Sequence, residues 1–428
     1  MQTGTSKDFD NLCGVDPLVK IFSDLIAFDT RADGSSKTVP SSVGQLRFGA
    51  YLSSTISELG YDSKQDEHGV ITVKIPASDG CEKAKSLCLL AHMDTAPDCS
   101  GADVKPRLVR KYSGEGIKLD NGLTITSSFC PELSSHIGED IIVTDGTTLL
   151  GADDKAGIAC LLLLLRNLKT DSSLKHGPLK IIFSVDEEIG LSTRYLDVKD
   201  IACDYGITVD GTELGELDVA TFNAYGAILN FHGTAVHTAV AYKNLVNAIT
   251  LATEFISMLP RDEKPENTRG EEGFYHVHGI EGEVERAKLK MIIRDFTDEG
   301  MKKRLDFVKS AVEFLNNKYG QGRVELDLKF QYSNMEEVLK QNQEILDICT
   351  KAFKDAGVKE VVLNRVRGGT DGSNLSSQGL PTPNIFTGGL NCHGPYECLP
   401  VDAFNSSYRV VEALVKRMSK TRNTKSKK

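Results

Sequence analysis

The sequence lacks an apolar run long enough to cross a bilayer. Its longest such run, Ile158 to Leu165, falls well short of the roughly 20 residues that a membrane-spanning helix needs. Residues 1–15 are polar and contain no apolar segment of the kind found in secretory signals. We therefore expect a cytoplasmic protein with no membrane partner.

The sequence also lacks any Cys-x-x-Cys pair. Its 10 cysteines are scattered, and several, such as Cys88 and Cys160, stand in apolar runs where a thiol behaves as a small hydrophobic group. This distribution does not predict a disulfide framework. A reducing compartment is the simplest interpretation of it.

An excess of positive charge is missing as well. The 50 basic and 60 acidic side chains give a formal net charge of −10. Because phosphate binding needs a basic face, this balance argues against a nucleic-acid partner. The one basic run covers residues 416–428, and we expect a solvated chain end there rather than a docking segment.

The composition that is present is typical of a globular protein with a sizeable core. Hydrophobic residues make up 40% of the chain and charged residues 26%. A length of 428 residues predicts about two or three domains.

The first half of the chain reads as helices alternating with strands. Asp16 to Phe28 is predicted to be a helix, with Asp16 as the N-cap and Pro17 at the first helical position. Further helices are expected at Ser42–Leu59 and Lys155–Leu168, and strands at Val70–Ile75, Ser86–Ala91, Leu179–Val185 and Tyr205–Val209. This alternation predicts an α/β fold whose sheet is covered by helices on both faces.

The pattern changes near Leu217. Strands are expected at 218–236, 273–281 and 284–296, and long helices at Asn244–Leu259 and Thr297–Asn317. From about residue 337 the alternation of helix and strand returns. We therefore predict an α/β fold with a discontinuous domain, residues 1–217 and 334–428, in which helices flank a mixed sheet. A smaller α+β domain, residues 218–333, is inserted into it.

Five short segments carry acidic or imidazole groups where a strand is expected to end or a helix to begin. They contain His92 with Asp94, Asp153 with Asp154, Glu187 with Glu188, Asp210, and His393. Each alone has an ordinary explanation. A surface histidine, acids at a helix N-terminus, an acidic loop, an Asp-Gly turn and a structural histidine among glycines would account for them one by one.

Together the five segments predict a metal site. The carboxyl ends of the strands of an open α/β sheet line one crevice, so these side chains are expected to meet. Carboxylates and imidazoles are ligands of zinc, and also of manganese or cobalt. Two such ions would activate a bridging water and polarise a scissile carbonyl, and a spare glutamate would accept the proton.

Seven longer motifs stand in the same order as in a known family. They are Ala91–Asp98, Gly151–Gly157, Glu272–His276, Val284–Ala287, Ile292–Phe296, Arg367–Gly372 and Phe386–Gly389. From about residue 16 to residue 416 the chain resembles the peptidase T family of tripeptide aminopeptidases. That family belongs to a clan of two-zinc exopeptidases that also contains glutamate carboxypeptidase and succinyl-diaminopimelate desuccinylase.

The resemblance implies a role for each matching residue. Two zinc ions per chain would be held by His92, Asp153, Glu188, Asp210 and His393, with Asp153 bridging both. Glu187 would be the general base and Asp94 would orient the metal site. The inserted domain would be a lid, and His237, Arg294 and Arg367 would bind a small peptide substrate. Members of this family often form homodimers through the lid, but the sequence gives no independent sign of a dimer.

The chain departs from the family pattern after the lid histidine. His237 is followed by Thr-Ala-Val-Ala-Tyr, where the family normally has Pro-Gly and then Thr-Ala. After His393 the usual basic and aromatic residues are replaced within the segment 395–398. A dipeptidase or an N-acyl amino-acid hydrolase on the same scaffold is therefore the main alternative. A non-catalytic peptide-binding protein is disfavoured, because every expected ligand and the expected base are present.

Overall fold

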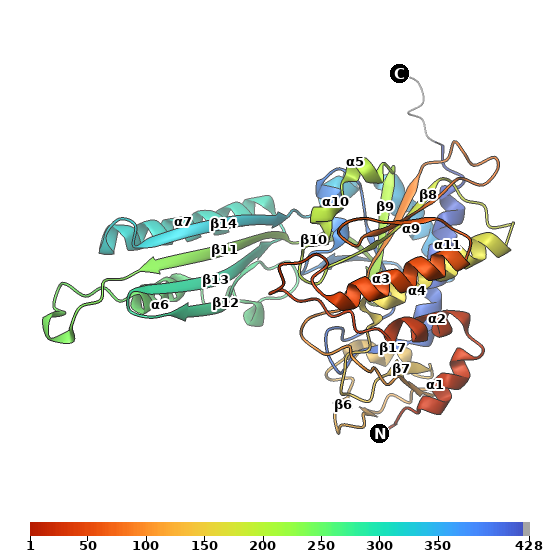
Figure 1. The fold of residues 1–428 in the computed structure, drawn as a ribbon, viewed down its shortest axis with the longest axis horizontal. Coiled ribbons are helices and arrows are strands. Elements are labelled where there is room, and N and C mark those ends of the chain that lie inside the picture. The colour runs from red at the N-terminus through yellow and green to blue at the C-terminus, as the bar shows by residue number, and fades with distance from the viewer. Residues whose placement is uncertain (423–428) are drawn as a thin grey trace, which may run out of the picture. The chain divides into compact units, whose positions relative to one another are not determined.

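The computed structural model describes residues 1–422, which form two compact units (Figure 1). Unit 1 comprises residues 1–219, 338–364 and the described residues from 370 onward, and unit 2 comprises residues 220–337 and 365–369. None of the helices in the described part combines the length and hydropathy that crossing a membrane requires. The last six residues of the predicted basic end, 423–428, lie outside the described residues.

Unit 1 is built on a mixed eight-stranded sheet with the strand order β1-β2-β8-β3-β9-β16-β10-β15. Its four central neighbours β8, β3, β9 and β16 run parallel to one another. β1 and β2, β2 and β8, and β10 and β16 pair antiparallel. The strands are β1 Ser63–Gln65, β2 Ile71–Ile75, β3 Leu87–His92, β8 Leu179–Ser184, β9 Tyr205–Gly211, β10 Glu216–Thr221, β15 Val362–Val366 and β16 Asn384–Phe386.

Helices pack against this sheet as the alternating pattern predicts. Asp16 caps the second helix by accepting N–H bonds from Leu18 (2.9 Å) and Val19 (3.2 Å), as expected of an aspartate N-cap. The helices are α1 Ser6–Cys13, α2 Pro17–Ile26, α3 Val43–Glu58, α4 Ala152–Thr170, α5 Val198–Ile201, α8 Glu336–Gln341, α9 Gln343–Asp355, α10 Asp371–Ser377 and α11 Val401–Met418. The predicted α/β class with a mixed sheet is therefore confirmed.

Helix α4 occupies the centre of unit 1. It packs on β3 and β9, and α2 and α11 pack against it in turn. Residues 156–165 are all buried, which explains why their sequence is apolar on every side. At Gly157 a β-carbon would lie 2.0 Å from the carbonyl oxygen of Val209, so only glycine allows this close approach of α4 to β9.

Two small sheets lie beside the main one. β4 (Arg107–Val109), β7 (Ile141–Val143) and β17 (Cys398–Pro400) form a three-stranded sheet, and β5 (Ile117–Lys118) pairs with β6 (Thr124–Ile125). These strands are too short for a periodic pattern, so the sequence did not predict them. They matter for the site, because β7 precedes the Asp153 segment and β17 follows the His393 segment. Short 3-10 helices occupy Pro131–His136 and Ser192–Tyr195.

Unit 2 is an antiparallel four-stranded sheet in the order β12-β13-β11-β14, with α6 and α7 packed on it. Its buried core includes Phe231 and Phe255, whose ring centroids are 6.2 Å apart. The elements are β11 Asn223–His232, α6 Ala248–Met258, β12 Phe274–Gly282, β13 Arg286–Asp295, α7 Asp298–Tyr319 and β14 Val324–Tyr332, with 3-10 helices at Thr238–Val240 and Pro265–Asn267.

Two strand predictions differ from the structure. The single strand expected at 218–236 is two strands in different sheets, since β10 pairs with β16 and β11 with β13 and β14. Phe222 stands between them and is itself buried against the rings of Phe274 and Phe296, so no polar break marks the change in the sequence. β14 was missed, although its alternating sequence Val-Glu-Leu-Asp-Leu-Lys-Phe is typical of a half-buried strand.

Candidate metal centre

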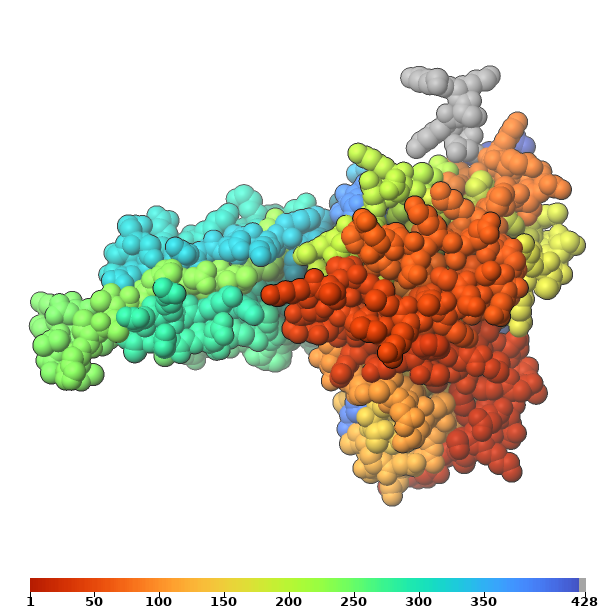
Figure 2. Space-filling model, in the orientation of Figure 1, coloured from red at the N-terminus to blue at the C-terminus, as the bar shows by residue number. Residues whose placement is uncertain are grey.

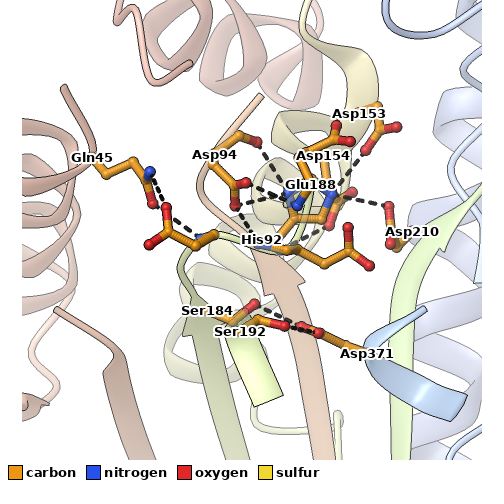
Figure 3. A network of polar contacts seen from close by, with 12 residues as sticks. Gln45, His92, Asp94, Asp153, Asp154, Ser184, Glu188, Ser192, Asp210 and Asp371 are labelled. Carbon is orange, nitrogen blue, oxygen red and sulfur yellow. Dashed lines mark hydrogen bonds and ion pairs between the residues drawn. The ribbon is translucent and has the colours of Figure 1, made fainter. Parts of the chain in front are cut away.

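The predicted site residues of unit 1 follow neighbouring parallel strands. His92 is the last residue of β3, Glu187 and Glu188 come just after β8, Asp210 lies near the end of β9, and His393 follows β16. Parallel strands end at the same edge of a sheet, so these side chains converge. Figure 3 shows the labelled members of this set around His92.

The side chains form two groups of candidate metal ligands that share Asp153. One group is His92, Asp153 and Asp210, and the other is Asp153, Glu188 and His393; within each group the ligand atoms lie within 4.8 Å of one another. His92 Nε2 is 2.8 Å from Asp153 Oδ1 and 3.4 Å from Asp210 Oδ1. His393 Nε2 is 3.1 Å from both Asp153 Oδ2 and Glu188 Oε2. Each oxygen of Asp153 therefore faces a different histidine.

Asp94 contacts both His92 and the glutamate pair and orients them. Its buried carboxylate accepts backbone N–H bonds from Glu187 and Glu188, each 3.0 Å long. Its carbonyl oxygen lies 3.0 Å from His92 Nδ1. A proton on Nδ1, donated to this carbonyl, leaves the Nε2 lone pair directed at the ligand groups.

The acid before the glutamate pair faces away from the ligand groups. Asp186 is buried with φ +57°, and it accepts hydrogen bonds from Ser41 N (2.8 Å), Ser41 Oγ (2.6 Å) and Gln45 Nε2 (2.7 Å). Three consecutive acids would repel one another, but the first is satisfied by neutral donors at the start of α3. The sequence did not predict this anchor.

The two adjacent aspartates also have different partners. Asp153 faces the histidines, whereas Asp154 is buried and accepts backbone N–H bonds from His92 (3.1 Å) and Gly157 (3.2 Å). Asp154 thus ties the start of α4 to the end of β3. The residue pattern placed both aspartates in one motif, and only the family resemblance assigned the bridging role to Asp153.

Two further buried carboxylates were missed. Asp371, at the start of α10, accepts hydrogen bonds from the hydroxyl groups of Ser184 (2.8 Å) and Ser192 (Figure 3). Glu397 accepts N–H bonds from the backbone that leads into Asp153. Asp371 belongs to the motif 367–372, and Glu397 to the altered segment after His393. Their place in these two segments was the signal by which the sequence could have singled them out.

The electrostatics of the site favour added positive charge. Burial, together with the nearby charge of Asp153, raises the pKa of Glu188 to about 7, and the same two causes raise the pKa of Asp210 to about 7. Burial alone would lower the pKa of His92, but Asp210 and Asp153 outweigh it and raise that pKa. Hydrogen bonds to Asp153 and Glu188 raise the pKa of His393 to about 11. Glu188 and Asp210 therefore resist ionisation and the imidazoles hold protons, whereas His393 and His92 hold the pKa of Asp153 below its usual range. This distribution of charge is expected where cations are needed.

One buried atom provides a direct test of whether these residues fit metal ions. Among residues 1–422, Glu188 Oε1 is buried without a hydrogen-bond partner. An unpaired carboxylate oxygen is costly in a protein interior, and a cation beside it removes that cost. The donor set of three carboxylates and two imidazoles, without cysteine, suits divalent cations at two adjacent positions.

The three predicted substrate-binding residues belong to unit 2 and have partners there. His237 Nδ1 accepts the N–H of Ala239 at 3.2 Å, next to the exposed turn 238–246 that Figure 2 shows in light green. Arg294 donates to the carbonyls of Tyr225 and Ile293 and lies 5.4 Å from the ring centroid of Tyr332.

Arg367 is the most firmly held of the three. It donates to the carbonyl oxygens of Gly270 (2.7 Å) and Glu272 (2.9 Å) and to Thr268 Oγ1 (2.8 Å). Its guanidinium group also lies 5.2 Å from the ring centroid of Phe222. A role of any of the three residues toward substrate stays a prediction.

A mixed α/β unit with two adjoining carboxylate and imidazole groups, together with an α+β unit, defines a metal-dependent hydrolase. The sequence model of the peptidase family M20/M25/M40 matches residues 145–417. The chain therefore belongs to that family.

Relatives within the family cover nearly the whole chain. The sequence is 42% identical over 401 residues to peptidase T of Caldanaerobacter subterraneus subsp. tengcongensis, with 93% of this chain and 98% of the relative covered. It is 41% identical over 402 residues to peptidase T of Bacillus subtilis, with 93% and 98% covered. The crystal structure of aminopeptidase PepT from Bacillus cereus has the same fold, with a TM-score of 0.72, 24% identity and coverage of 94% of this chain and 98% of that one.

Proposed function

We propose that this protein is a dinuclear metallo-aminopeptidase that releases the N-terminal residue from tripeptides. The observation that carries the proposal is the pair of three-residue ligand groups that share Asp153. Relatives named peptidase T, about 40% identical over more than nine-tenths of the chain, support the substrate class.

The chain's own side chains would divide the metal ions between them. His92, Asp153 and Asp210 would hold one, and Asp153, Glu188 and His393 the other. Zinc is the proposed ion, and manganese or cobalt suits the same oxygen and nitrogen donors. When bound, a pair of such ions polarises a scissile carbonyl and lowers the pKa of water.

Glu187 is the proposed general base. Its carboxylate belongs to neither ligand group, and its backbone N–H is fixed by Asp94. Burial, followed by the charges of Asp371 and Asp210, raises the pKa of Glu187, which favours proton uptake. Glu187 would accept the proton of the attacking water and deliver it to the leaving amine.

The inserted residues 218–333 are proposed as a lid domain, and residues 1–217 and 334–428 as the catalytic domain. His237, Arg294 and Arg367 would hold the peptide, because a guanidinium group binds a terminal carboxylate through two parallel hydrogen bonds. Arg367 also makes three hydrogen bonds within unit 2. These bonds support a second, structural role for Arg367 in holding the 268–272 loop. A cytoplasmic location and a homodimer complete the proposal.

A peptide panel with metal analysis of the same sample tests the proposal. The panel holds di-, tri- and tetrapeptides with matched N-terminal residues, together with N-acetylated tripeptides. We expect about two metal ions per chain, release of the N-terminal residue from tripeptides, and loss of turnover after chelation. Turnover that is unaffected by chelation would contradict the metallopeptidase assignment.

A second candidate function is a dipeptidase or N-acyl amino-acid hydrolase. The observation that favours it is the turn after His237, which has no Pro-Gly and exposes Val240 (58%) and Tyr242 (83%). A changed turn would alter which substrate ends are accepted. Faster cleavage of dipeptides or N-acetylated substrates than of free tripeptides would select this candidate.

A further inference from the structure

Glu397 is a buried carboxylate with no role in the proposed reaction. Its side chain is 1% exposed. Oε2 accepts the backbone N–H of Leu150 at 2.6 Å and that of Gly151 at 2.7 Å, and Oε1 accepts the N–H of Asp153 at 3.2 Å. A single side chain therefore satisfies three backbone donors at the start of α4.

Those donors have no helical partners, because the chain is irregular where α4 begins. Gly151 has φ +82°, and Asp153 and Asp154 have non-helical backbone angles. Regular helical geometry begins only at Lys155. Without the Glu397 carboxylate, buried N–H groups in this segment would be unpaired, and the backbone that aims Asp153 would be free to shift.

The same carboxylate is attached to the segment that carries His393. Backbone bonds between Leu390 and Cys398, 2.9 and 3.0 Å long, close this segment, and Glu397 N donates to Gly394 O at 3.1 Å within it. Cys398 then pairs with Val143 in β17 and β7. Glu397 thus links the backbone of His393 to the backbone of Asp153.

We propose that Glu397 is a positioning residue that holds Asp153 and His393 in register for metal binding. The inference rests on the proposed function. The proposal implies that the two ligand groups depend on Glu397 to different extents. Two of the three ligands in the group of Asp153, Glu188 and His393 depend on Glu397, but only Asp153 does so in the other group.

Glu397→Gln is the informative substitution, because it keeps the size and removes one acceptor. The amide oxygen can still accept the N–H groups of Leu150 and Gly151, but the amide nitrogen then faces the N–H of Asp153 donor to donor. Asp204→Asn is the matched control. Asp204 Oδ2 likewise accepts two hydrogen bonds, from Ser86 N and Ser86 Oγ, both 2.9 Å, away from the ligand segments.

The test measures zinc affinity by chelator competition on the full chain, alongside the visible spectrum of cobalt-loaded protein. Glu397→Gln is expected to weaken the less tightly held of two zinc ions by about 10–100-fold, the usual effect of losing a group that orients a metal ligand. Its cobalt spectrum should change, and excess zinc should restore most of kcat. Asp204→Asn should keep the parental affinity and spectrum.

Stability measurements separate positioning from a purely structural role. With metal removed, Glu397→Gln should still unfold cooperatively and remain folded at the assay temperature, although the unpaired N–H of Asp153 costs some stability. A zinc affinity within threefold of the parent, an equal loss of zinc affinity in the control, or failure of both Glu397→Gln and Glu397→Asp to fold would overturn the proposal. Parent protein without two metal ions would instead refute the proposed function on which the inference rests.

Discussion

At the scale of single residues, Glu187 and Glu188 share one anchor and have different surroundings. Asp94 accepts the backbone N–H of both. Only Glu188 lies 3.1 Å from His393 Nε2 and belongs to a ligand group. Asp94 fixes the backbone of both glutamates, so their two adjacent side chains can take different roles.

Replacing Glu187 by alanine tests this division. Because the general base is lost while every candidate ligand remains, we expect kcat to fall by about 10²–10⁴-fold. Metal content, measured by elemental analysis, should equal that of the parent. Glu67→Ala, on an 87% exposed side chain, serves as the control and should be fully active. Parental turnover in Glu187→Ala would refute the base assignment.

Asp218 predicts a measurable pH dependence of stability. Burial raises its pKa to about 6 from the ordinary aspartate value of 3.8, against the opposing hydrogen bonds from Asn364 and Asn384. The folded state therefore binds the proton more tightly than the unfolded state. The resulting stabilisation is full below pH 3.8 and is lost as pH rises through about 6.

Asp218→Asn removes this titration. Over the pH window from about 4 to 6, the free energy of unfolding of the parent should fall relative to that of the variant by roughly 3 kcal/mol. Urea unfolding of both proteins at several pH values measures the difference. Parallel pH profiles for the two proteins would show that the Asp218 pKa is not raised.

At the scale of elements, the close packing of α4 on β9 brings two ligand segments together. Asp153 precedes the regular part of α4, and Asp210 follows Val209 in β9. The carbonyl of Val209 occupies the space that a side chain at Gly157 would need. The distance between these two elements therefore depends on a glycine.

Gly157→Ala should separate α4 from β9. Overpacking against a backbone carbonyl is expected to cost about 1–3 kcal/mol or more of unfolding free energy, and to lower kcat because Asp210 moves with β9. Gly49→Ala in α3 is the matched control, since the nearest atom to its β-carbon would be the end of the flexible Gln65 side chain, at 2.8 Å, and no backbone atom lies close. That change should be neutral or stabilising by up to about 1 kcal/mol. Equal denaturation midpoints for the two variants would contradict the argument.

At the scale of the whole molecule, all five candidate ligands belong to unit 1 and none to unit 2. Metal binding to the folded state should therefore stabilise unit 1 alone, by about 2.7 kcal/mol at a free concentration of 100 times Kd. Chelation should speed hydrogen exchange in β3 and β9 and leave β11 and β13 unchanged. Mass spectrometry of exchange with and without chelator measures both units in one sample. Equal acceleration of hydrogen exchange in both units would contradict the expectation that metal stabilises unit 1 alone.

The fold class and the five segments of the candidate site followed from local pattern, and the family resemblance assigned each residue its role. The strands that precede His92, Glu187 and Asp210 were visible because each apolar run stops at or near a polar residue. The short strands β4, β7 and β17 were not visible, because three residues carry no periodicity. Nor was the change of sheet at Phe222, since that residue is as buried as the strands it separates.

The sequence by itself determined which residue types are available at the sheet edge: two imidazoles, a shared aspartate and a glutamate pair at the ends of predicted elements. Only the tertiary structure decided which carboxylate faces a histidine and which is held by backbone. Asp153 and Asp154 are adjacent, as are Asp186 and Glu187, and no local pattern separates them. Their roles are set by partners far away in the chain, such as Gln45 and Glu397, which folding alone brings near.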